Sequence, residues 1–161
     1  MSIQDYFGEH QKRWDTYYNR ICRAVASKSP CLSRQIGAIL VKENVVVATG
    51  YNGPPRGYPH CESVDYGLCP RKAKGYASGE GLHECPAVHA EANCIISAAR
   101  IGASVSGSIL YMNCIIPCKD CMSLLINAGV WEIVVDDTVP YHEVSLSMAE
   151  SANVKIRRFK L

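Results

Sequence analysis

Helix and strand patterns alternate along the C-terminal half of the sequence, and this alternation limits the possible folds more than any other feature. In chain order the patterns predict a helix at 88–100, a strand at 108–113, a helix at 118–128, a strand at 131–135, a helix at 141–151 and an edge strand at 154–158. Pro117 and Gly129 bracket the second helix, as expected for its start and its end. Strands separated by helices favour βαβ units, with parallel neighbouring strands and helices on both faces of the sheet.

The N-terminal third predicts a long helix followed by a β-hairpin. From Asp5 to Lys28, aromatic and aliphatic side chains recur mostly three or four residues apart, and Pro30 follows the end of the segment. Two apolar, partly β-branched segments at 36–41 and 45–49 are separated by polar residues, a pattern typical of a hairpin.

Residues 53–86 show no convincing periodicity. They contain six glycines, five prolines and three cysteines, so regular structure is not expected there. An unstructured loop of this length inside a compact domain normally has a function or is held in place by a cross-link such as a metal ion. At 161 residues the chain has the length of one domain, so we predict a single domain over 1–161 with an insertion at about 53–86.

Composition excludes several classes of protein. With 48% hydrophobic and 20% charged residues the chain is ordinary globular protein and not disordered, and its net charge of +2 excludes a strongly basic protein that coats nucleic acid. No apolar run approaches the ~18 residues of a membrane span, and the first residues lack the layout of a signal peptide. We therefore expect a cytoplasmic protein. In that reducing compartment its nine cysteines indicate metal binding or catalysis.

The strongest chemical signal is His89-Ala90-Glu91, followed 26 residues after Glu91 by Pro117-Cys118-Lys119-Asp120-Cys121. One histidine and two cysteines are three ligands that zinc prefers, and three protein ligands leave the fourth tetrahedral position to water. His89 and Cys118 both stand where helices are expected to begin, so two helix N-termini would face one ion. Glu91 would then move protons next to the metal. The pattern H-x-E…P-C-x-x-C is the signature of zinc nucleobase deaminases.

Four segments together resemble the deoxycytidylate deaminases of the cytidine-deaminase-like superfamily, and the resemblance extends from about residue 12 to residue 158. The segments are Cys31-Leu-Ser-Arg-Gln-Ile-Gly-Ala-Ile, Gly50-Tyr-Asn-Gly-Pro-Pro-Arg-Gly, Cys85-Pro-Ala-Val-His-Ala-Glu and Pro117-Cys-Lys-Asp-Cys. The resemblance implies a three-layer α/β/α fold around a five-stranded mixed sheet. It also implies hydrolytic deamination of dCMP at C4, which gives dUMP for thymidylate synthesis and ammonia.

The same resemblance implies roles for single residues. It makes His89, Cys118 and Cys121 the ligands of the catalytic zinc and Glu91 the proton shuttle. Asn52 and the backbone around Ala90 would contact the nucleotide. The chain departs from many relatives at 113–116, which hold no threonine. The resemblance further implies a homo-oligomer, often a hexamer, that dCTP together with Mg²⁺ activates and dTTP inhibits.

Four further cysteines predict a second, structural zinc site that cross-links the 53–86 insertion. This insertion has few apolar anchors, and a closed site with four ligands would fix it. Our first choice for the ligands is Cys31, Cys61, Cys69 and Cys85, with His60 or His83 as substitutes for one of them. The remaining cysteines, Cys22, Cys94 and Cys114, lie in helix or strand patterns and are expected to be core residues.

A nucleoside monophosphate requires cations or free N–H groups around its phosphate. Arg34 and Arg56 flank the Asn52 loop and are our choice, with Ser33 as an added hydroxyl. Arg100 would serve an interface or an effector pocket. The basic residues near the C-terminus, Lys155, Arg157, Arg158 and Lys160, are expected to form a solvated edge that protects the last strand from aggregation.

Two alternative functions stay open at this point. The chain could deaminate another substrate, such as dCTP, a nucleoside, 5-substituted dCMP or a base in a polynucleotide, although its low net charge argues against polynucleotides. It could also be a zinc module that binds a partner and catalyses nothing. The variant Glu91→Gln separates these functions, because only an enzyme loses turnover.

Overall fold

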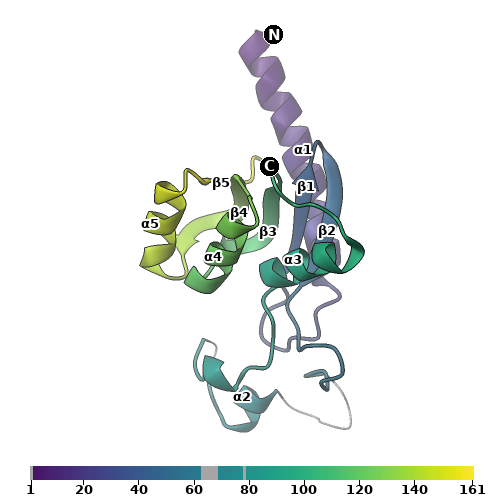
Figure 1. The fold of residues 1–161 in the computed structure, drawn as a ribbon, viewed down its shortest axis with the longest axis vertical. Coiled ribbons are helices and arrows are strands. Elements are labelled where there is room, and N and C mark those ends of the chain that lie inside the picture. The colour runs from purple at the N-terminus through teal and green to yellow at the C-terminus, as the bar shows by residue number, and fades with distance from the viewer. Residues whose placement is uncertain (1, 63–68, 78) are drawn as a thin grey trace.

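Five strands form one mixed sheet in the order β2-β1-β3-β4-β5 (Figure 1). The computed structural model describes residues 2–62, 69–77 and 79–161. The strands are β1 (Gly37–Lys42), β2 (Val45–Tyr51), β3 (Ile109–Ile116), β4 (Glu132–Pro140) and β5 (Lys155–Arg158). β1 runs antiparallel to β2 and β3, whereas β3, β4 and β5 are parallel. The predicted hairpin, the parallel βαβ units and the five-stranded mixed sheet are therefore confirmed.

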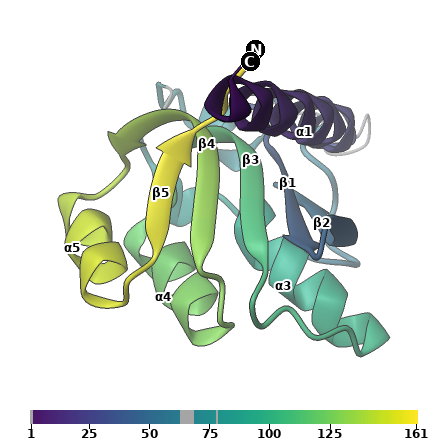
Figure 2. The same ribbon diagram turned by 90° about the horizontal axis from the view of Figure 1, so that it is seen from above.

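Helices cover both faces of this sheet, which gives three layers (Figure 2). The helices are α1 (Ile3–Ala26), α2 (Pro70–Ala73), α3 (Ala90–Ile101), α4 (Lys119–Asn127) and α5 (Glu143–Ser151), with a 3₁₀ turn at Leu82–Glu84. Strand alternation sorts the core: Ile39 and Val41 pack in the cluster under α1, while Ala38 and Leu40 pack in the cluster with α3. No helix in the described ranges is both long and apolar enough to cross a membrane.

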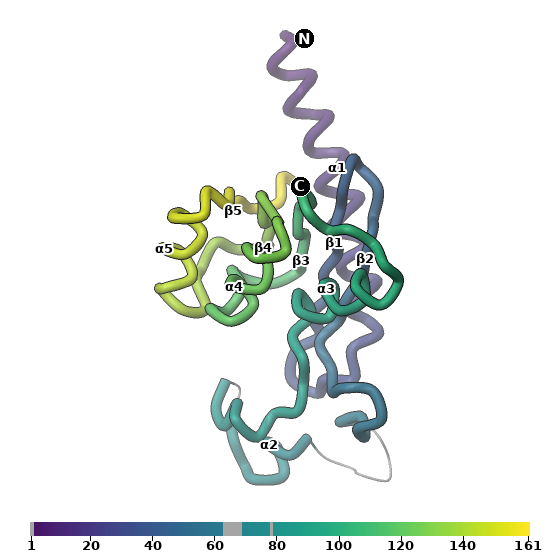
Figure 3. Tube along the Cα trace, in the orientation of Figure 1, coloured from purple at the N-terminus to yellow at the C-terminus, as the bar shows by residue number. Residues whose placement is uncertain are grey.

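The 53–86 insertion leaves the sheet after β2 and returns to it directly before α3. A two-residue bridge closes it: the Gly53 N–H donates to the Val88 carbonyl at 3.1 Å, and the Val88 N–H donates back at 2.8 Å. In Figure 3 the insertion extends from one end of the sheet, opposite to the end where α1 begins. The short helix α2 and the 3₁₀ turn lie within it and were not predicted, because they are single turns without periodicity.

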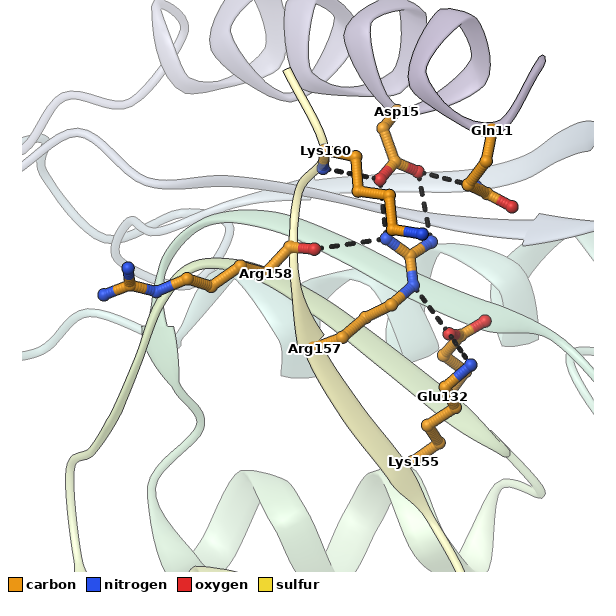
Figure 4. A network of polar contacts seen from close by, with 7 residues as sticks. All are labelled: Gln11, Asp15, Glu132, Lys155, Arg157, Arg158 and Lys160. Atoms are coloured by element: carbon orange, nitrogen blue, oxygen red, sulfur yellow. Dashed lines mark hydrogen bonds and ion pairs between the residues drawn. The ribbon is translucent and has the colours of Figure 1, made fainter. Parts of the chain in front are cut away.

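The prediction of a fully solvated C-terminal edge is wrong for Arg157. Its side chain is only 16% exposed and forms ion pairs with Asp15 at 2.5 Å and Glu132 at 2.8 Å (Figure 4). The buried Asp15 carboxylate also accepts the Lys160 backbone N–H at 2.8 Å. Asp15 lies 142 residues before Arg157, so local sequence carried no sign of this pairing. Lys155 and Arg158 are exposed, as expected.

Candidate active site

The topology brings distant segments to one edge of the sheet. Met112, in the middle of β3, is paired with Ala38 at the start of β1, so the second half of β3 extends past that start, and Gly37 is paired with Tyr51 at the end of β2. The loop before β1, the end of β2 and the turn from β3 into α4 therefore meet at this edge. In α/β sheets, ligands bind at the carboxyl ends of parallel strands where the chain connections diverge.

Three predicted metal ligands converge here. The donor atoms of His89, Cys118 and Cys121 all lie within 4.8 Å of one another, and His89 Nδ1 is 3.5 Å from each sulfur. His89 is the N-cap residue of α3 and Cys118 is the N-cap residue of α4, so two helix N-termini face the same point, as predicted. The Cys118 sulfur also accepts the backbone N–H of Cys121.

The two sulfurs are tuned differently. A hydrogen bond from Cys121, supported by one from His89, lowers the pKa of the Cys118 thiol to about 4. The same hydrogen bond with Cys118, together with burial, raises the pKa of Cys121. One thiolate is thus favoured by the protein alone, and a bound dication would favour both. Two thiolates and one imidazole, with no fourth protein ligand among the described residues, fit a zinc ion with an open position.

Glu91 lies in the first turn of α3, two residues after the histidine ligand, and its side chain is buried. Burial raises the pKa of this carboxyl above its usual value. Glu91 lines the same cavity as His89 and Cys118. The arrangement places a buried carboxyl beside a metal site, where it can accept and donate a proton.

The walls of this cavity include several other predicted site residues, namely Ser33, Arg34, Asn52 and Ala90. The Asn52 side chain braces the loop before β1: its Nδ2 donates to the Arg34 carbonyl at 2.9 Å, and its Oδ1 accepts the Ile36 N–H at 2.8 Å. Asn52 thereby fixes the backbone that carries Ser33 and Arg34. Arg56 and Arg100 are exposed and do not line this cavity.

Among the polar residues of the cavity wall, the sequence analysis did not assign Arg71, Cys114 and Tyr141 to the site. Arg71 lies in α2 with only 7% of its surface exposed, and it donates to the carbonyls of Glu80 at 2.5 Å and Ala77 at 2.9 Å. Cys114 is buried, as predicted, but its sulfur also accepts a hydrogen bond from Arg34 at 3.3 Å. No sequence signal marks Arg71 or Tyr141, because the insertion and the β4–α5 turn come to the cavity only through the tertiary fold.

The second cysteine set gathers loosely near this cavity, and Cys31 and Cys85 line it. Burial and the proximity of Cys69 raise the pKa of Cys61 to about 11. Against the effect of burial, backbone N–H groups of Lys72 and Arg71 at the start of α2 lower the pKa of Cys69. Within the described ranges, only the His89 group brings three or more metal donors within 4.8 Å. The second zinc, with His60 or His83 as substitute ligands, therefore stays a prediction.

The fold and the site together define a class of protein: a three-layer α/β/α domain with a donor group of one histidine and two cysteines that fits a zinc ion. Residues 12–136 match the model of the cytidine and deoxycytidylate deaminase zinc-binding region. The chain belongs to this family, which confirms the resemblance found in the sequence.

Named relatives are similar over most of the chain. A deoxycytidylate deaminase of Saccharomyces cerevisiae is 32% identical over 146 residues, which are 91% of this chain but only 45% of the yeast protein. The chain thus spans less than half of that relative. A deoxycytidylate deaminase of Mycobacterium phage D29 is 36% identical over 75% of this chain and 92% of its own length.

A solved structure has the same fold. The dCMP deaminase of cyanophage S-TIM5, crystallised in complex with dCMP and dUMP, is 25% identical and superposes with a TM-score of 0.67 over 89% of this chain and 94% of its own. This agreement confirms the predicted cytidine-deaminase-like fold.

Proposed function

We propose that this chain hydrolyses dCMP to dUMP and ammonia. The observation that carries the proposal is the buried carboxyl of Glu91 beside the His89, Cys118 and Cys121 donor group, in one cavity. Water adds at C4 of the pyrimidine and the C4–N4 bond breaks, so the products balance as dUMP and NH₃. The names of the relatives support the choice of substrate.

The residues divide the chemistry among them. A zinc ion held by His89, Cys118 and Cys121 would acidify a water molecule and so supply a nucleophile at neutral pH. Glu91 would take one proton from the attacking water and deliver it to ring N3, and would then take the second proton from the oxygen now bonded to C4 and deliver it to the departing amino group. Ser33, Asn52 and the backbone at Ala90 would contact the sugar and the pyrimidine.

Two arginines support a phosphate on the substrate. Arg34 and Arg71 both line the cavity, and in the described part of the chain neither has a carboxylate in ion-pair contact. The guanidinium of Arg71 is buried against neutral carbonyls, so its charge is not neutralised by the contacts it makes. A phosphate dianion is the counter-charge that such a pair favours.

Ammonia release from zinc-loaded protein tests the proposal with dCMP, CMP, deoxycytidine, dCTP and a cytosine-containing oligonucleotide. We expect fast release from dCMP. Arg71→Leu and Arg34→Ala should raise KM for dCMP at least tenfold while leaving the slow turnover of deoxycytidine unchanged. Arg56→Ala is the matched variant, because Arg56 was predicted for the phosphate but does not line the cavity. Release only from another substrate would void the assignment of dCMP, and no release from any would void the enzymatic function.

We also propose a structural zinc on Cys31, Cys61, Cys69 and Cys85, because the 53–86 insertion has little apolar core of its own. Cys69, Cys31 and Cys85 each raise the pKa of Cys61, which supports the proximity of the four thiols. A reducing compartment such as the cytoplasm suits a chain whose nine cysteines are all free thiols.

Assembly into a hexamer and control by dCTP and dTTP are further proposals that rest on the resemblance, with Arg100 as the candidate effector or interface residue. Sigmoidal dCMP kinetics that dCTP with Mg²⁺ makes hyperbolic would support them. Hyperbolic kinetics that neither triphosphate changes would remove them.

A further inference from the structure

Asn93 is a polar residue in a largely apolar part of α3, and its side chain contacts the sheet. Its neighbours Ala92 and Cys94 are buried, and asparagine in a helix interior forms helix less readily than alanine or leucine. The Asn93 Nδ2 donates to the Tyr51 carbonyl at the end of β2 at 2.8 Å and makes a longer contact with the Val88 carbonyl at 3.5 Å. The side chain thus joins two other segments of the chain to the start of α3.

The Tyr51 carbonyl lies on the open side of β2, which is the edge strand of the sheet. Gly37 of β1 is opposite Tyr51, but the Gly37 N–H points the other way and donates to the Asn113 side chain of β3 at 2.7 Å. In an antiparallel ladder such a pair exchanges no backbone hydrogen bonds, so the Tyr51 carbonyl faces away from β1. The Asn93 amide supplies the donor that a neighbouring strand would otherwise supply.

The Val88 carbonyl belongs to the bridge that closes the 53–86 insertion. It accepts the Gly53 N–H at 3.1 Å, and the Asn93 amide approaches the same oxygen from α3. An amide nitrogen carries two N–H groups, so one side chain can serve both carbonyls. The bridge and the amide together link the end of β2 to the residue before His89.

Every group that Asn93 joins lies one or two residues from a residue of the site. These site residues are Asn52 after Tyr51, His89 after Val88, and Glu91 two residues before Asn93 itself. Asn52 in turn braces the loop before β1 through its own amide. Asn93 does not line the cavity, so it can act on the site only through these neighbours.

The metal donors cannot set the same distance. An ion held by His89, Cys118 and Cys121 would tie the N-terminus of α3 to that of α4. None of these donors lies on β2 or on the loop before β1. The spacing between Glu91 and the part of the wall formed by Asn52 therefore depends on contacts between α3 and β2, and Asn93 provides a polar one.

We propose that Asn93 is a positioning residue for the deamination, an inference that rests on the function proposed above. Through Tyr51 and Val88 it fixes the start of α3, which carries Glu91, relative to the end of β2, which carries Asn52. A misplacement of about 1 Å between reacting groups can lower a rate roughly 100-fold. Because the groups that would bind the nucleotide remain in the variant, loss of the amide should lower kcat more than it raises KM.

Steady-state kinetics of zinc-loaded Asn93→Leu with dCMP tests the proposal. Leucine is similar in size but donates no hydrogen bond, so we expect kcat to fall at least about tenfold and KM to change by less than about threefold. Zinc content should not change. Asn19→Leu is the matched variant, because Asn19 is a buried asparagine of α1 whose side chain also has two partners, Arg23 and Asp136. Asn19 lies outside the cavity, so this variant should lose stability and keep the wild-type kcat.

Urea denaturation verifies that both variants fold, and Asn93→Ala with Asn19→Ala replaces the leucine pair if Asn93→Leu does not. An unchanged kcat in Asn93→Leu would overturn the proposal, as would a rise in KM alone or an equal loss of kcat in Asn19→Leu.

A readout without turnover separates this proposal from the proposed function. If the wild type releases no ammonia from dCMP, the proposed function fails, and hydrogen exchange of the Gly53 and Val88 N–H groups still tests the link between α3 and β2. Faster exchange of both groups in Asn93→Leu than in Asn19→Leu would support the link, and equal exchange would remove it.

Discussion

At the scale of single residues, this site combines acidic groups whose pKa values the environment shifts in opposite directions. Burial raises the pKa of the Glu91 carboxyl and favours its protonated form. Hydrogen bonds from Cys121 and His89 lower the pKa of the Cys118 thiol and favour its thiolate form. The buried guanidinium of Arg71 forms part of the wall of the same cavity. Such closely spaced, oppositely tuned groups are typical of active sites.

The variant Glu91→Gln keeps the size and burial of the side chain but removes the proton it carries. We expect turnover of dCMP to fall by at least about 10²–10⁴-fold, the usual contribution of general acid–base catalysis. Zinc content, measured on the same preparation, should not change because Glu91 is not a ligand. Glu150→Gln, an exposed residue of α5, is the matched control. Unchanged turnover would exclude the role given to Glu91.

At the scale of secondary-structure elements, two glycines of the β1–β2 hairpin, Gly37 and Gly50, let the backbones of α1 and α3 approach the sheet closely. A Cβ atom added at Gly37 would lie 2.1 Å from the Cys22 carbonyl in α1, and one added at Gly50 would lie 2.3 Å from the Ala90 carbonyl in α3. These glycines let both layers approach the β1–β2 hairpin closely. The contact at Gly50 also sets the position of the turn that carries Glu91.

Gly50→Ala should therefore displace α3 as well as strain the core. We expect the free energy of unfolding to fall by about 1–3 kcal/mol, as for overpacking, and turnover to fall in the protein that remains folded. Gly8→Ala, which meets nothing within 4 Å, should change neither. Urea denaturation and ammonia release measure the two effects, and full stability in Gly50→Ala would contradict the close contact.

The tie between α1 and β5 depends on one buried ion pair. Asp15→Asn leaves the Arg157 guanidinium with only Glu132 as a charged partner, and breaking a buried pair costs about 3–5 kcal/mol. Arg158→Ala removes an exposed pair and should cost less than about 1 kcal/mol. Denaturant unfolding of both variants gives the comparison, and equal losses would show that burial does not strengthen the Asp15 pair.

At the scale of the whole molecule, the 53–86 insertion closes the cavity that the sheet opens. It supplies Arg71 and Leu82 to the wall and begins and ends at the bridge beside His89. Its stability should therefore affect the proposed activity, even though Glu91 and the three metal donors lie on the core elements.

Metal analysis measures whether a second zinc fixes this insertion. We expect two zinc ions per chain in the wild type and one in Cys69→Ser, together with faster proteolysis within 53–86. Cys22→Ala, at a buried thiol outside both cysteine sets, should keep two. A wild-type content of one zinc per chain would remove the structural site.

Much of the fold followed from local patterns, and the departures have physical causes. Periodicity located the long helices and all five strands to within a few residues, although β3 and β4 extend further than the apolar runs that predicted them. It missed α2 because a helix of four residues has no periodicity, and it misjudged Arg157 because the side chain that pairs with it lies at the other end of the chain.

By itself the sequence determined which residues carry the proposed chemistry: His89, Glu91, Cys118 and Cys121 are selected by residue type and spacing, since a metal and a proton shuttle demand particular atoms. Only the tertiary structure decided which cations share the cavity, for Arg71 lines it and Arg56 does not. It also decided which face of α1 is left exposed. The chemistry of a ligand group depends on residue type and on the spacing within each motif, whereas burial and charge pairing depend on segments that meet only after the chain has folded.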